Sequence, residues 1–437
     1  MAPSATHWVL KTAALLILLP APLLAQDDDP WSNEQWDDEG WGKEEEALPF
    51  NGFVEAAAGT RFTRDPLLSK RETLEELRWR LETEWNTAAL SLRFKSDLAY
   101  DGIEKGWDAE FRDLTVGFRI GESIDARVGQ QVLTWGTGDL VFLNDLFPKD
   151  FVSFFAGRDD DYLKAPSATL RFTRFSDTIN IDVAWTPLFE PDVYLNGERF
   201  SFFSPLAGSN VSPDPPLAAV EPSDSLSNGE LAVRLFKTVE GREYALYAYD
   251  GFFKQPTALT AAFEPTFAAL TAIGASLRQP AGPGLVNFET AYYWSRDDKN
   301  GTDPLLPNDQ LRLLAGYEWE PKANFTVGLQ YYLKWTRDHD ALVRNSPAAE
   351  FEPDELRHVL TTRLSFRAGL DRHVFSLFAF VSPSDRDFYL RPSYQFRYSD
   401  EWSWVLGGNL FGGDAQHTFF SQLQDASNAY LRIRYHY

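Results

Sequence analysis

The chain ends in an amphipathic strand whose apolar face is rimmed by tyrosine. Over residues 429–437, Ala429, Leu431, Ile433, Tyr435 and Tyr437 alternate with Tyr430, Arg432, Arg434 and His436. Successive side chains of a strand point to opposite faces, so one face is apolar and the other is cationic. A soluble protein with such a strand would expose an edge that invites aggregation, whereas a closed membrane barrel has no edge. The pattern therefore predicts a transmembrane β-barrel of the Gram-negative outer membrane.

The N-terminus has the features of a secretory signal peptide. Lys11 precedes an apolar run over residues 12–24, and Leu23 and Ala25 stand where signal peptidase reads the chain before Gln26. No other stretch approaches the ~20 apolar residues that a membrane helix needs. The absence of cysteine rules out both a lipid anchor on the N-terminus and disulfides. We expect a signal peptide at 1–25, removed on export, a periplasmic tail at 26–48 and a barrel at 49–437.

Composition agrees with a barrel of alternating faces. Aromatic residues make up 15% of the 437 residues, yet the mean hydropathy is only −0.33. Strands that alternate between lipid-facing and lumen-facing side chains produce this combination. The net charge of −23 argues against nucleic acid as a partner.

Residues 27–46 form an acidic segment with regularly spaced tryptophans. They hold ten of the 64 acidic residues, and Trp31, Trp36 and Trp41 recur every five residues. One interpretation is a solvated periplasmic tail, because charge repulsion and few aliphatic residues oppose folding. The other is a partner-docking peptide in which the three indoles are anchors.

From Phe50 onward, strands are joined alternately by tight turns and longer loops. We predict tight turns at 86–87, 121–123, 176–177, 240–242, 280–284, 321–324, 369–372 and 399–400. We predict the longer loops at 136–166, 188–228, 253–266, 297–308 and 337–355. This alternation is typical of periplasmic turns and extracellular loops. The fold class is therefore all-β, an antiparallel up-and-down barrel of about 18 strands, with 16 as the alternative, and with one inward-folded loop.

Many arginines fall on the predicted lumenal faces of these strands. They are Arg78, Arg80, Arg93, Arg234, Arg312, Arg363, Arg367, Arg391, Arg397, Arg432 and Arg434. One interpretation is a polar wall in which these cations pair with carboxylates across strands. The other is a ladder that conducts or binds anions.

The segment 127–166 differs from the strands, because it is rich in phenylalanine and studded with charges. Its apolar residues need burial, which predicts that the segment folds into the barrel and narrows it. The candidates for the constriction are Trp135, Asp139, Asn144, Asp145, Asp150, Arg158, Asp159, Asp160, Asp161 and Lys164. The alternative is that these charges brace the loop against the wall arginines. The loop 188–228 is the expected external lid.

A motif in this segment resembles a family of outer-membrane barrels. Arg127-x-Gly129-x-Gln131, Trp135-Gly136 and Asn144-Asp145-Leu146-x-Pro148-x-Asp150 are similar to poorly characterised proteobacterial barrels, grouped with domains of unknown function and related to alginate-export-type porins. The resemblance covers about 40 residues. It implies linkage to MMPL-like transporters of the resistance-nodulation-division (RND) superfamily and to a periplasmic carrier of lipoprotein-carrier fold. Gln130 departs from the family, where many relatives have arginine.

The function predicted from the sequence is transport across the outer membrane, either as a porin-like channel or as the outer-membrane part of a system for lipids or hydrophobic compounds. The expected partners are outer-membrane lipid, the barrel-assembly machinery through the C-terminal strand, and a periplasmic carrier or RND-type transporter. We expect no cofactor, metal or enzyme activity. The alternatives are a plugged structural or adhesive barrel and an outer-membrane hydrolase that uses His358 or His417.

Overall fold

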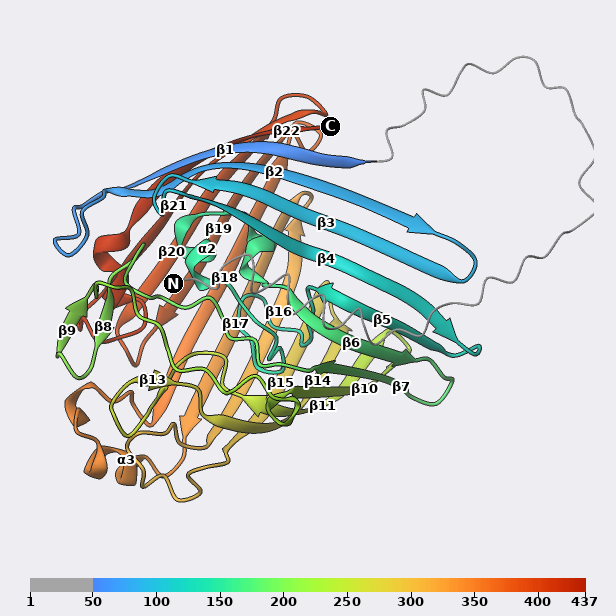
Figure 1. Ribbon diagram of the computed structural model, residues 1–437. Coiled ribbons are helices and arrows are strands. Elements are labelled where there is room, and N and C mark those ends of the chain that lie inside the picture. The colour runs from blue at the N-terminus through green and yellow to red at the C-terminus, as the bar shows by residue number, and fades with distance from the viewer. Residues whose placement is uncertain (1–49) are drawn as a thin grey trace, which may run out of the picture.

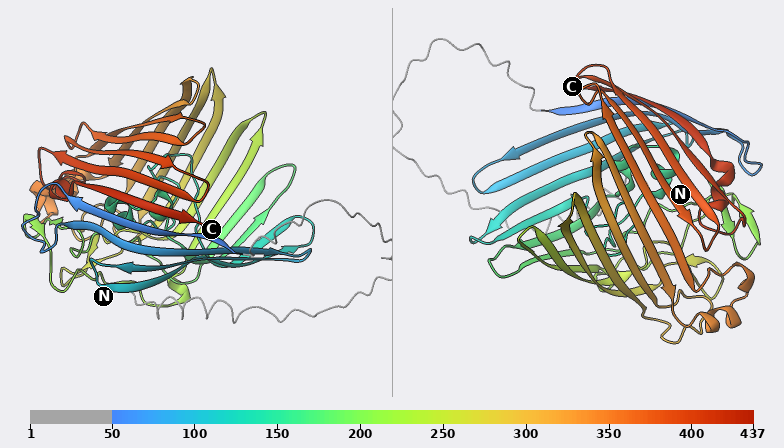
Figure 2. Two further views of the ribbon diagram at one scale, coloured as in Figure 1. Left: turned by 90° about the horizontal axis from the view of Figure 1, so that it is seen from above. Right: turned by 180° about the vertical axis from the view of Figure 1, so that it is seen from behind.

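The computed structural model describes residues 50–437, which form one closed antiparallel barrel of 18 strands. The strands run around the ring in chain order, and the blue N-terminal strands meet the red C-terminal strands (Figure 1 and Figure 2). The prediction of about 18 strands is confirmed. The signal peptide, the acidic tail and Trp31, Trp36 and Trp41 lie outside the described residues, so the predictions made for them stay predictions.

Eighteen strands form the wall. They are β1 (Asn51–Arg61), β2 (Glu72–Asn86), β3 (Leu90–Asp101), β4 (Gly106–Ile120), β5 (Ile124–Gln131), β6 (Ser167–Arg174), β7 (Asn180–Thr186), β10 (Glu230–Val239), β11 (Arg242–Phe252), β14 (Ala269–Ala281), β15 (Gly284–Ser295), β16 (Gln310–Lys322), β17 (Phe325–Thr336), β18 (Leu356–Ala368), β19 (His373–Ser382), β20 (Asp387–Arg397), β21 (Trp402–Gly413) and β22 (Asn428–His436).

Short elements occupy the loops. They are α2 (Phe151–Ala156), α3 (His339–Asn345), the single 3₁₀ turns η1 (Asp160–Leu163), η2 (Leu226–Asn228), η3 (Ala349–Phe351) and η4 (Ser421–Ala426), and the small hairpins β8 (Phe202–Ser204) with β9 (Ser209–Val211) and β12 (Ala258–Leu259) with β13 (Pro265–Thr266). Within residues 50–437 no helix has the length and apolar character needed to cross a membrane.

All eight predicted tight turns join neighbouring strands at one end of the barrel, which also holds both ends of the wall. The predicted long loops lie at the other end, together with two loops that the sequence analysis missed, 62–71 and 414–427. Two connections at this loop end, 102–105 and 383–386, are as short as the turns opposite. The strict alternation of short and long connections was therefore an approximation.

The alternation of side chains along the strands follows the sequence. On β22, Leu431, Ile433 and Tyr435 are 38–43% exposed on the outer face, whereas Tyr430 and Arg432 are buried on the inner face. The strand therefore has the lipid-facing and lumen-facing sides that its pattern predicts.

The barrel closes through its first and last strands. Strand β22 pairs with β1 from Phe53 opposite His436 to Arg61 opposite Asn428, and Gly52 and Tyr437 exchange backbone hydrogen bonds of 3.2 Å. The Tyr437 hydroxyl accepts from Trp79 Nε1 at 2.6 Å and donates to the Arg80 carbonyl at 2.6 Å. The terminal tyrosine thus links the seam between β22 and β1 to the neighbouring strand β2.

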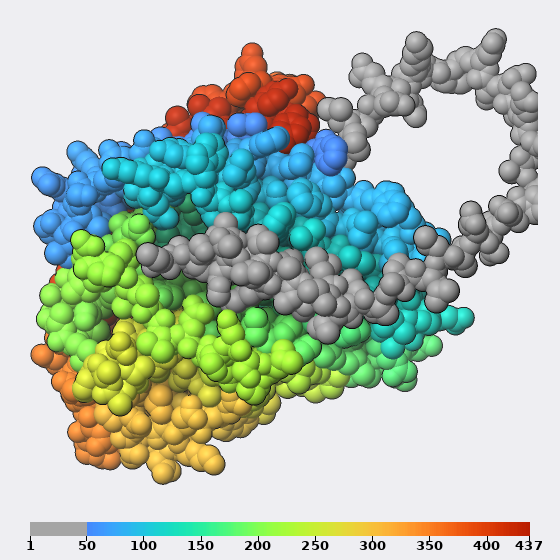
Figure 3. Space-filling model, in the orientation of Figure 1, coloured from blue at the N-terminus to red at the C-terminus, as the bar shows by residue number. Residues whose placement is uncertain are grey.

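The hydrophobic core lies inside the barrel rather than between layers. It is built by residues of the 132–166 segment, called L3 below, which pack against the inner faces of the strands. The loop 187–229, called L4, covers L3 at the loop end. Figure 3 shows L4 in green between the blue N-terminal segments and the yellow and orange loops. L3 is the inward-folded loop that the sequence predicts.

Candidate functional site

L3 crosses the lumen to the opposite wall. It leaves the wall at β5, and its Asp139 forms an ion pair with Arg363 of β18, which lies nine strands further around the ring of 18. The Arg363 Nη2 donates to Asp139 Oδ1 at 2.7 Å. Gln330 of β17 exchanges two hydrogen bonds of 2.8 Å with the Asp139 backbone. These contacts hold L3 across the full width of the barrel.

Glu289 of β15 anchors the start of this crossing. Its buried carboxylate accepts from the backbone N–H of Thr137, from that of Gly138 at 2.7 Å, and from Asn144 Nδ2 at 2.9 Å. Gly136 has a φ of 83°, so the redirection after Trp135 needs the left-handed conformation that glycine adopts without strain. The Glu289 carboxylate thereby accepts from three donors of L3.

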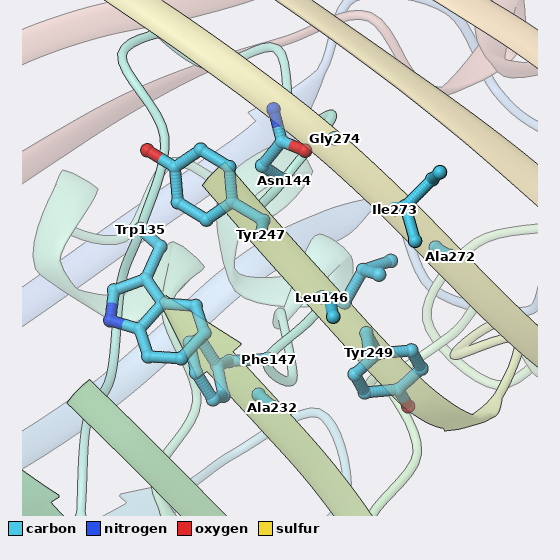
Figure 4. Close-up of a pocket in the computed structure, with 11 residues that line it drawn as sticks. Trp135, Asn144, Leu146, Phe147, Ala232, Tyr247, Tyr249, Ala272, Ile273 and Gly274 are labelled. Carbon is cyan, nitrogen blue, oxygen red and sulfur yellow. The ribbon is translucent and has the colours of Figure 1, made fainter. Parts of the chain in front are cut away.

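An aromatic cluster fixes the next part of L3. Trp135 packs edge-on against Phe147 at 5.0 Å and near Tyr247 of β11 at 6.2 Å between ring centroids. Figure 4 shows these rings together with Asn144 and Leu146 over Gly274 of β14. The void between them is only about 10 Å³. Trp135 is therefore a packing residue of L3 and is closed off from open space.

Helix α2 carries further aromatic residues to the far wall. Asp150 caps it by accepting from Ser153 N at 2.7 Å, and Gly157 ends it with a φ of 93°. Phe154 and Phe155 then pack edge-on against Tyr389 of β20 at 5.6 and 5.8 Å. Burial raises the pKa of the Asp150 carboxyl, although Arg158 and the Ser153 hydrogen bonds oppose that shift.

The charged residues after α2 lie among the wall arginines. Asp159 pairs with both Arg432 and Arg434 of β22 at 3.1 Å. Asp160 pairs with Arg391 of β20, whose Nη2 also donates to the Arg158 carbonyl at 3.0 Å. Burial would raise the pKa of Asp159, but the two arginines outweigh it and hold that pKa well below its usual range.

Arg158 and Tyr162 complete this junction with β2 and β3. Arg158 pairs with Glu76 at 2.6 Å and with Asp101 at 3.1 Å. The Tyr162 hydroxyl donates to Asp97 at 2.6 Å and accepts from Arg80 at 2.6 Å. The Tyr162 ring also lies 4.3 Å from the Arg78 guanidinium carbon and 4.7 Å from that of Arg112. Burial raises the pKa of this phenol, so it stays protonated and keeps donating to Asp97.

L4 is bonded to L3 through Asp192. The Asp192 carboxylate accepts from the Lys149 backbone N–H and from Gln255 Nε2, each at 2.7 Å. Burial raises the pKa of Asp192 to about 6, although Lys149 and Lys254 oppose the shift. Seven residues after Asp192, Arg199 ties L4 to β2 by donating to the Thr73 carbonyl at 3.0 Å.

Cavities of several hundred cubic ångströms remain around these loops. One of about 560 Å³ lies between L3 and strands β14–β19 under the loops at 304–308 and 352–353. One of about 390 Å³ lies between the second half of L3, L4 and strands β2–β5. The third, of about 520 Å³, opens at the turn end of β3–β10 and is lined by Arg127, Arg171 and Arg234. L3 therefore narrows the lumen and leaves open spaces on both its sides.

The predicted constriction residues divide into three groups. Asp139, Asn144, Arg158, Asp159 and Asp160 bind the wall. Trp135, Asp145 and Asp150 stabilise L3 itself; Asp145 pairs with Lys149 at 2.9 Å. The side chains of Asp161 and Lys164 form no hydrogen bond or ion pair within residues 50–437, although Arg112 binds both of their carbonyls. That these residues contact a solute stays a prediction.

The predicted lumenal arginines are mostly paired. Arg78 and Arg80 share Asp97, Arg93 meets Glu84 and Arg234 meets Glu243. Arg363, Arg391, Arg432 and Arg434 bind L3 carboxylates, as described above. Arg367 and Arg397 are exposed near the turn end. Pairing across strands thus accounts for Arg78, Arg80, Arg93 and Arg234, and pairing with L3 accounts for four more. The ladder interpretation stays a prediction.

The predicted site residues do not include Lys334 of β17, Arg357 of β18 or Tyr162 of L3. Lys334 stands directly opposite Arg312 of β16 on one side and Arg357 on the other. The tight turn between β16 and β17 does not give the first pairing by itself, because a bulge between Trp319 and Lys322 shifts the register of the hairpin by one residue. The second pairing joins strands on either side of the long loop 337–355, and a loop of that length does not determine which residues of the two strands lie opposite each other.

Within residues 50–437, the imidazole rings of His358 and His417 bond no serine hydroxyl, although Ser382 and Ser384 bond the His358 backbone. His358 Nδ1 bonds the Tyr331 hydroxyl at 2.7 Å, and the His417 ring packs beside Phe203 and Phe351. Among residues 50–437, one imidazole meets a serine hydroxyl, His436 with Ser403 at 3.3 Å, and no side chain bonds its other ring nitrogen. A nucleophile, a base and an orienting group are thus not assembled there.

Comparison with known proteins identifies the architecture. No protein-family model and no curated protein matches the chain. Among solved structures, 89% of the chain matches 97% of Pseudomonas aeruginosa OccK5 (OpdH), with 11% identity and a TM-score of 0.52. It matches 98% of a BenF-like porin from Pseudomonas fluorescens Pf-5, with 10% identity and a TM-score of 0.52. It also matches 97% of P. aeruginosa OccK2 (OpdF) in complex with glucuronate, with 10% identity and a TM-score of 0.51. At these identities the likeness establishes the fold: the chain has the 18-stranded barrel of the outer-membrane porins.

Proposed function

We propose that the protein is a transport barrel of the Gram-negative outer membrane, with a solute path through a lumen narrowed by L3. The observation that carries this proposal is the crossing of L3 from β5 to Arg363 of β18, with cavities of about 560 and 390 Å³ left beside it. A lumen crossed by one braced loop restricts solutes by size and charge. The fold shared with outer-membrane porins supports the same function.

Planar-bilayer recordings of the purified protein test this function. A channel gives stable single-channel steps, and their ion selectivity reports the charge of the lumen. Silence in recordings from folded protein, with folding checked by heat-modifiable mobility on gels, would overturn the channel form of the proposal.

We further propose that the barrel serves a system for lipids or other hydrophobic compounds, with a periplasmic carrier or an RND-type transporter as its partner. The family resemblance of residues 127–150 and the tryptophans at 31, 36 and 41 support this part. Deleting residues 27–46 should abolish capture of the periplasmic partner while the barrel still folds. Unchanged capture by the truncated chain would exclude the tail as the docking segment.

A plugged structural barrel is the second candidate, and the double bracing of L3 favours it. Asp139 ties the loop to β18, and Asp159 ties it to β22, four strands further around the ring. If L3 is a permanent plug, the protein conducts no ions and shows no transport phenotype. Removal of L4 residues 188–228 would then impair surface binding without any change in permeability.

A further inference from the structure

Three cations lie side by side on the inner face of β16, β17 and β18. Arg312 is directly opposite Lys334, and Lys334 is directly opposite Arg357, so the three side chains point to one face of the wall. We call Arg312, Lys334 and Arg357 the cationic row. Like charges directly opposite each other destabilise a sheet, so the row is a cost to the fold that other residues must offset.

Neighbouring carboxylates offset only part of this charge. Arg357 pairs with Asp385 at 2.5 Å, but its Nη2 is buried without a hydrogen-bond partner. Arg312 bonds the neutral Gln310 side chain at 2.6 Å and lies 3.9 Å from the Tyr293 ring centre. The Lys334 side chain has no hydrogen bond or ion pair within residues 50–437. Arg312 and Lys334 therefore remain without a carboxylate at salt-bridge distance.

The cationic row lines the cavity of about 560 Å³ between L3 and β14–β19. The other cations there are already neutralised: Lys149 by Asp145 at 2.9 Å and Lys254 by Glu230 at 2.6 Å. Of the acids in the lining, Glu352 accepts from the Ser346 hydroxyl at 2.6 Å, and Asp192 bonds L3. At the row itself, three basic side chains face two carboxylates, Asp385 and Glu352, so the excess of positive charge there is one.

The rest of the same cavity is apolar and aromatic. L3 contributes Leu140, Val141, Phe142, Leu146, Phe147 and Phe151, and the facing strands and loops add further aliphatic and aromatic side chains. Its volume lies within the range of about 300–1,000 Å³ that is usual for ligand pockets. An apolar space with one cationic wall is complementary to a molecule with an apolar tail and an anionic head.

We infer that this cavity is a binding site for amphipathic organic anions, with the head group on the cationic row and the tail against L3. The inference deepens the proposed function, because it names the class of solute that the path would take up from the loop end. A carboxylate accepts from guanidinium and ammonium groups in charge-assisted hydrogen bonds, the strong class of hydrogen bond. Arg357 Nη2 and Lys334 Nζ are the donors available for it.

Equilibrium binding of octanoate to the full-length barrel in nonionic detergent tests the site, by calorimetry or by saturation-transfer NMR. Octan-1-ol has the same tail without the charge, and acetate has the head without the tail. We expect octanoate to bind saturably. Octan-1-ol and acetate should each bind at least about tenfold more weakly than octanoate. Equal binding of octanoate and octan-1-ol would overturn the role of the row, and no saturable octanoate binding would overturn the site.

Lys334→Met should weaken octanoate binding by about tenfold, because it removes an ammonium group and keeps a flexible apolar side chain. Lys322→Met is the matched control, since Lys322 is exposed at the turn end of β16 and should leave binding unchanged. Lys334→Arg should restore most of the affinity, which separates loss of charge from misfolding. An unchanged affinity in Lys334→Met, or an equal loss in Lys322→Met, would contradict the inference.

The two proposals fail separately. Wild-type protein that conducts ions but does not bind octanoate would refute the site and leave the channel intact. Wild-type protein that binds octanoate but is silent in bilayers would refute the channel and leave the binding site.

Discussion

The Arg363 guanidinium of β18 donates to both carboxylate oxygens of Asp139 in L3, on the side of the barrel opposite β5. The pair is partly exposed, at 30% for the arginine and 40% for the aspartate side chain. Exposed ion pairs contribute about 0–1 kcal/mol to stability, so this contact adds little to folding. Its effect is on position, because it fixes where L3 crosses the lumen.

Asp139→Asn should therefore change conductance more than stability. Without the pair the crossing of L3 loosens, and we expect larger and noisier single-channel currents with a stability loss below about 1 kcal/mol. Bilayer recordings and urea unfolding in detergent measure the two effects. Asp125→Asn, which breaks an exposed pair with Arg119 near the turn end, is the control. Identical currents in the two variants would mean that Asp139 does not position the crossing.

Tyr162→Phe should destabilise the junction of L3 with β2 and β3. The change removes a hydroxyl that joins Asp97 to Arg80, and the buried acceptor and donor lose that partner. We expect a loss of about 1–3 kcal/mol in the free energy of unfolding. Tyr398→Phe, at an exposed turn position, should cost much less. Equal losses in both variants would place the stabilisation elsewhere.

Phe155→Ala should be strongly destabilising. The Phe155 side chain is almost fully buried against Tyr389 and Phe411, and truncation of such a residue costs about 3–5 kcal/mol. Unfolding by urea, followed by the loss of heat-modifiable mobility, measures the effect. Leu226→Ala, at a residue that is 68% exposed, serves as control. A loss below about 1 kcal/mol for Phe155→Ala would show that L3 is not part of the cooperative core.

Anion binding in the cavity beside L3 should strengthen as pH falls through about 6. Asp192 lines this cavity, and its pKa of about 6 means that its carboxyl takes up a proton there in the folded protein. Lys149 and Lys254 face it; Lys149 is paired with Asp145, and Lys254 is paired with Glu230. The space therefore becomes more positive below about pH 6.

Titration with octanesulfonate, whose head group stays ionised, measures this change as an affinity gain of about threefold to tenfold between about pH 8 and 5. Asp192→Asn should show the higher affinity at both pH values. The same raised pKa has a stability consequence: the group favours folding below about pH 4, and this contribution is lost as pH rises through about 6. A pH profile that is unchanged in Asp192→Asn would assign the effect to another group.

The wall of the barrel could be predicted from the sequence. Apolar and polar residues alternate within each strand, and each turn contains residues that end a strand. Leu431, Ile433 and Tyr435 face outward and Arg432 inward, as their alternation requires. The inward course of L3 could also be predicted, since residues such as Phe154 and Phe155 need burial. Its partners could not, because Asp139 with Arg363 and Asp159 with Arg432 are 224 and 273 residues apart.

The cationic row shows the same limit at smaller scale. Arg312 and Lys334 lie on one hairpin, but a bulge between Trp319 and Lys322 shifts its register by one residue after the turn. Arg357 meets Lys334 across a loop of 19 residues, 337–355, and no local signal sets that pairing. Function in this barrel therefore depends on contacts that periodicity does not encode.

The pairing of Asp159 with Arg432 and Arg434 gives L3 a place in the order of assembly. These arginines belong to β22, which is made last and also pairs with β1, so the inner loop and the seam of the wall share one strand. Before β22 arrives, Asp159 lacks its two cations and Glu55 of β1 lacks Arg434. The step that seals the cylinder is then also the step that completes the contacts between L3 and the wall.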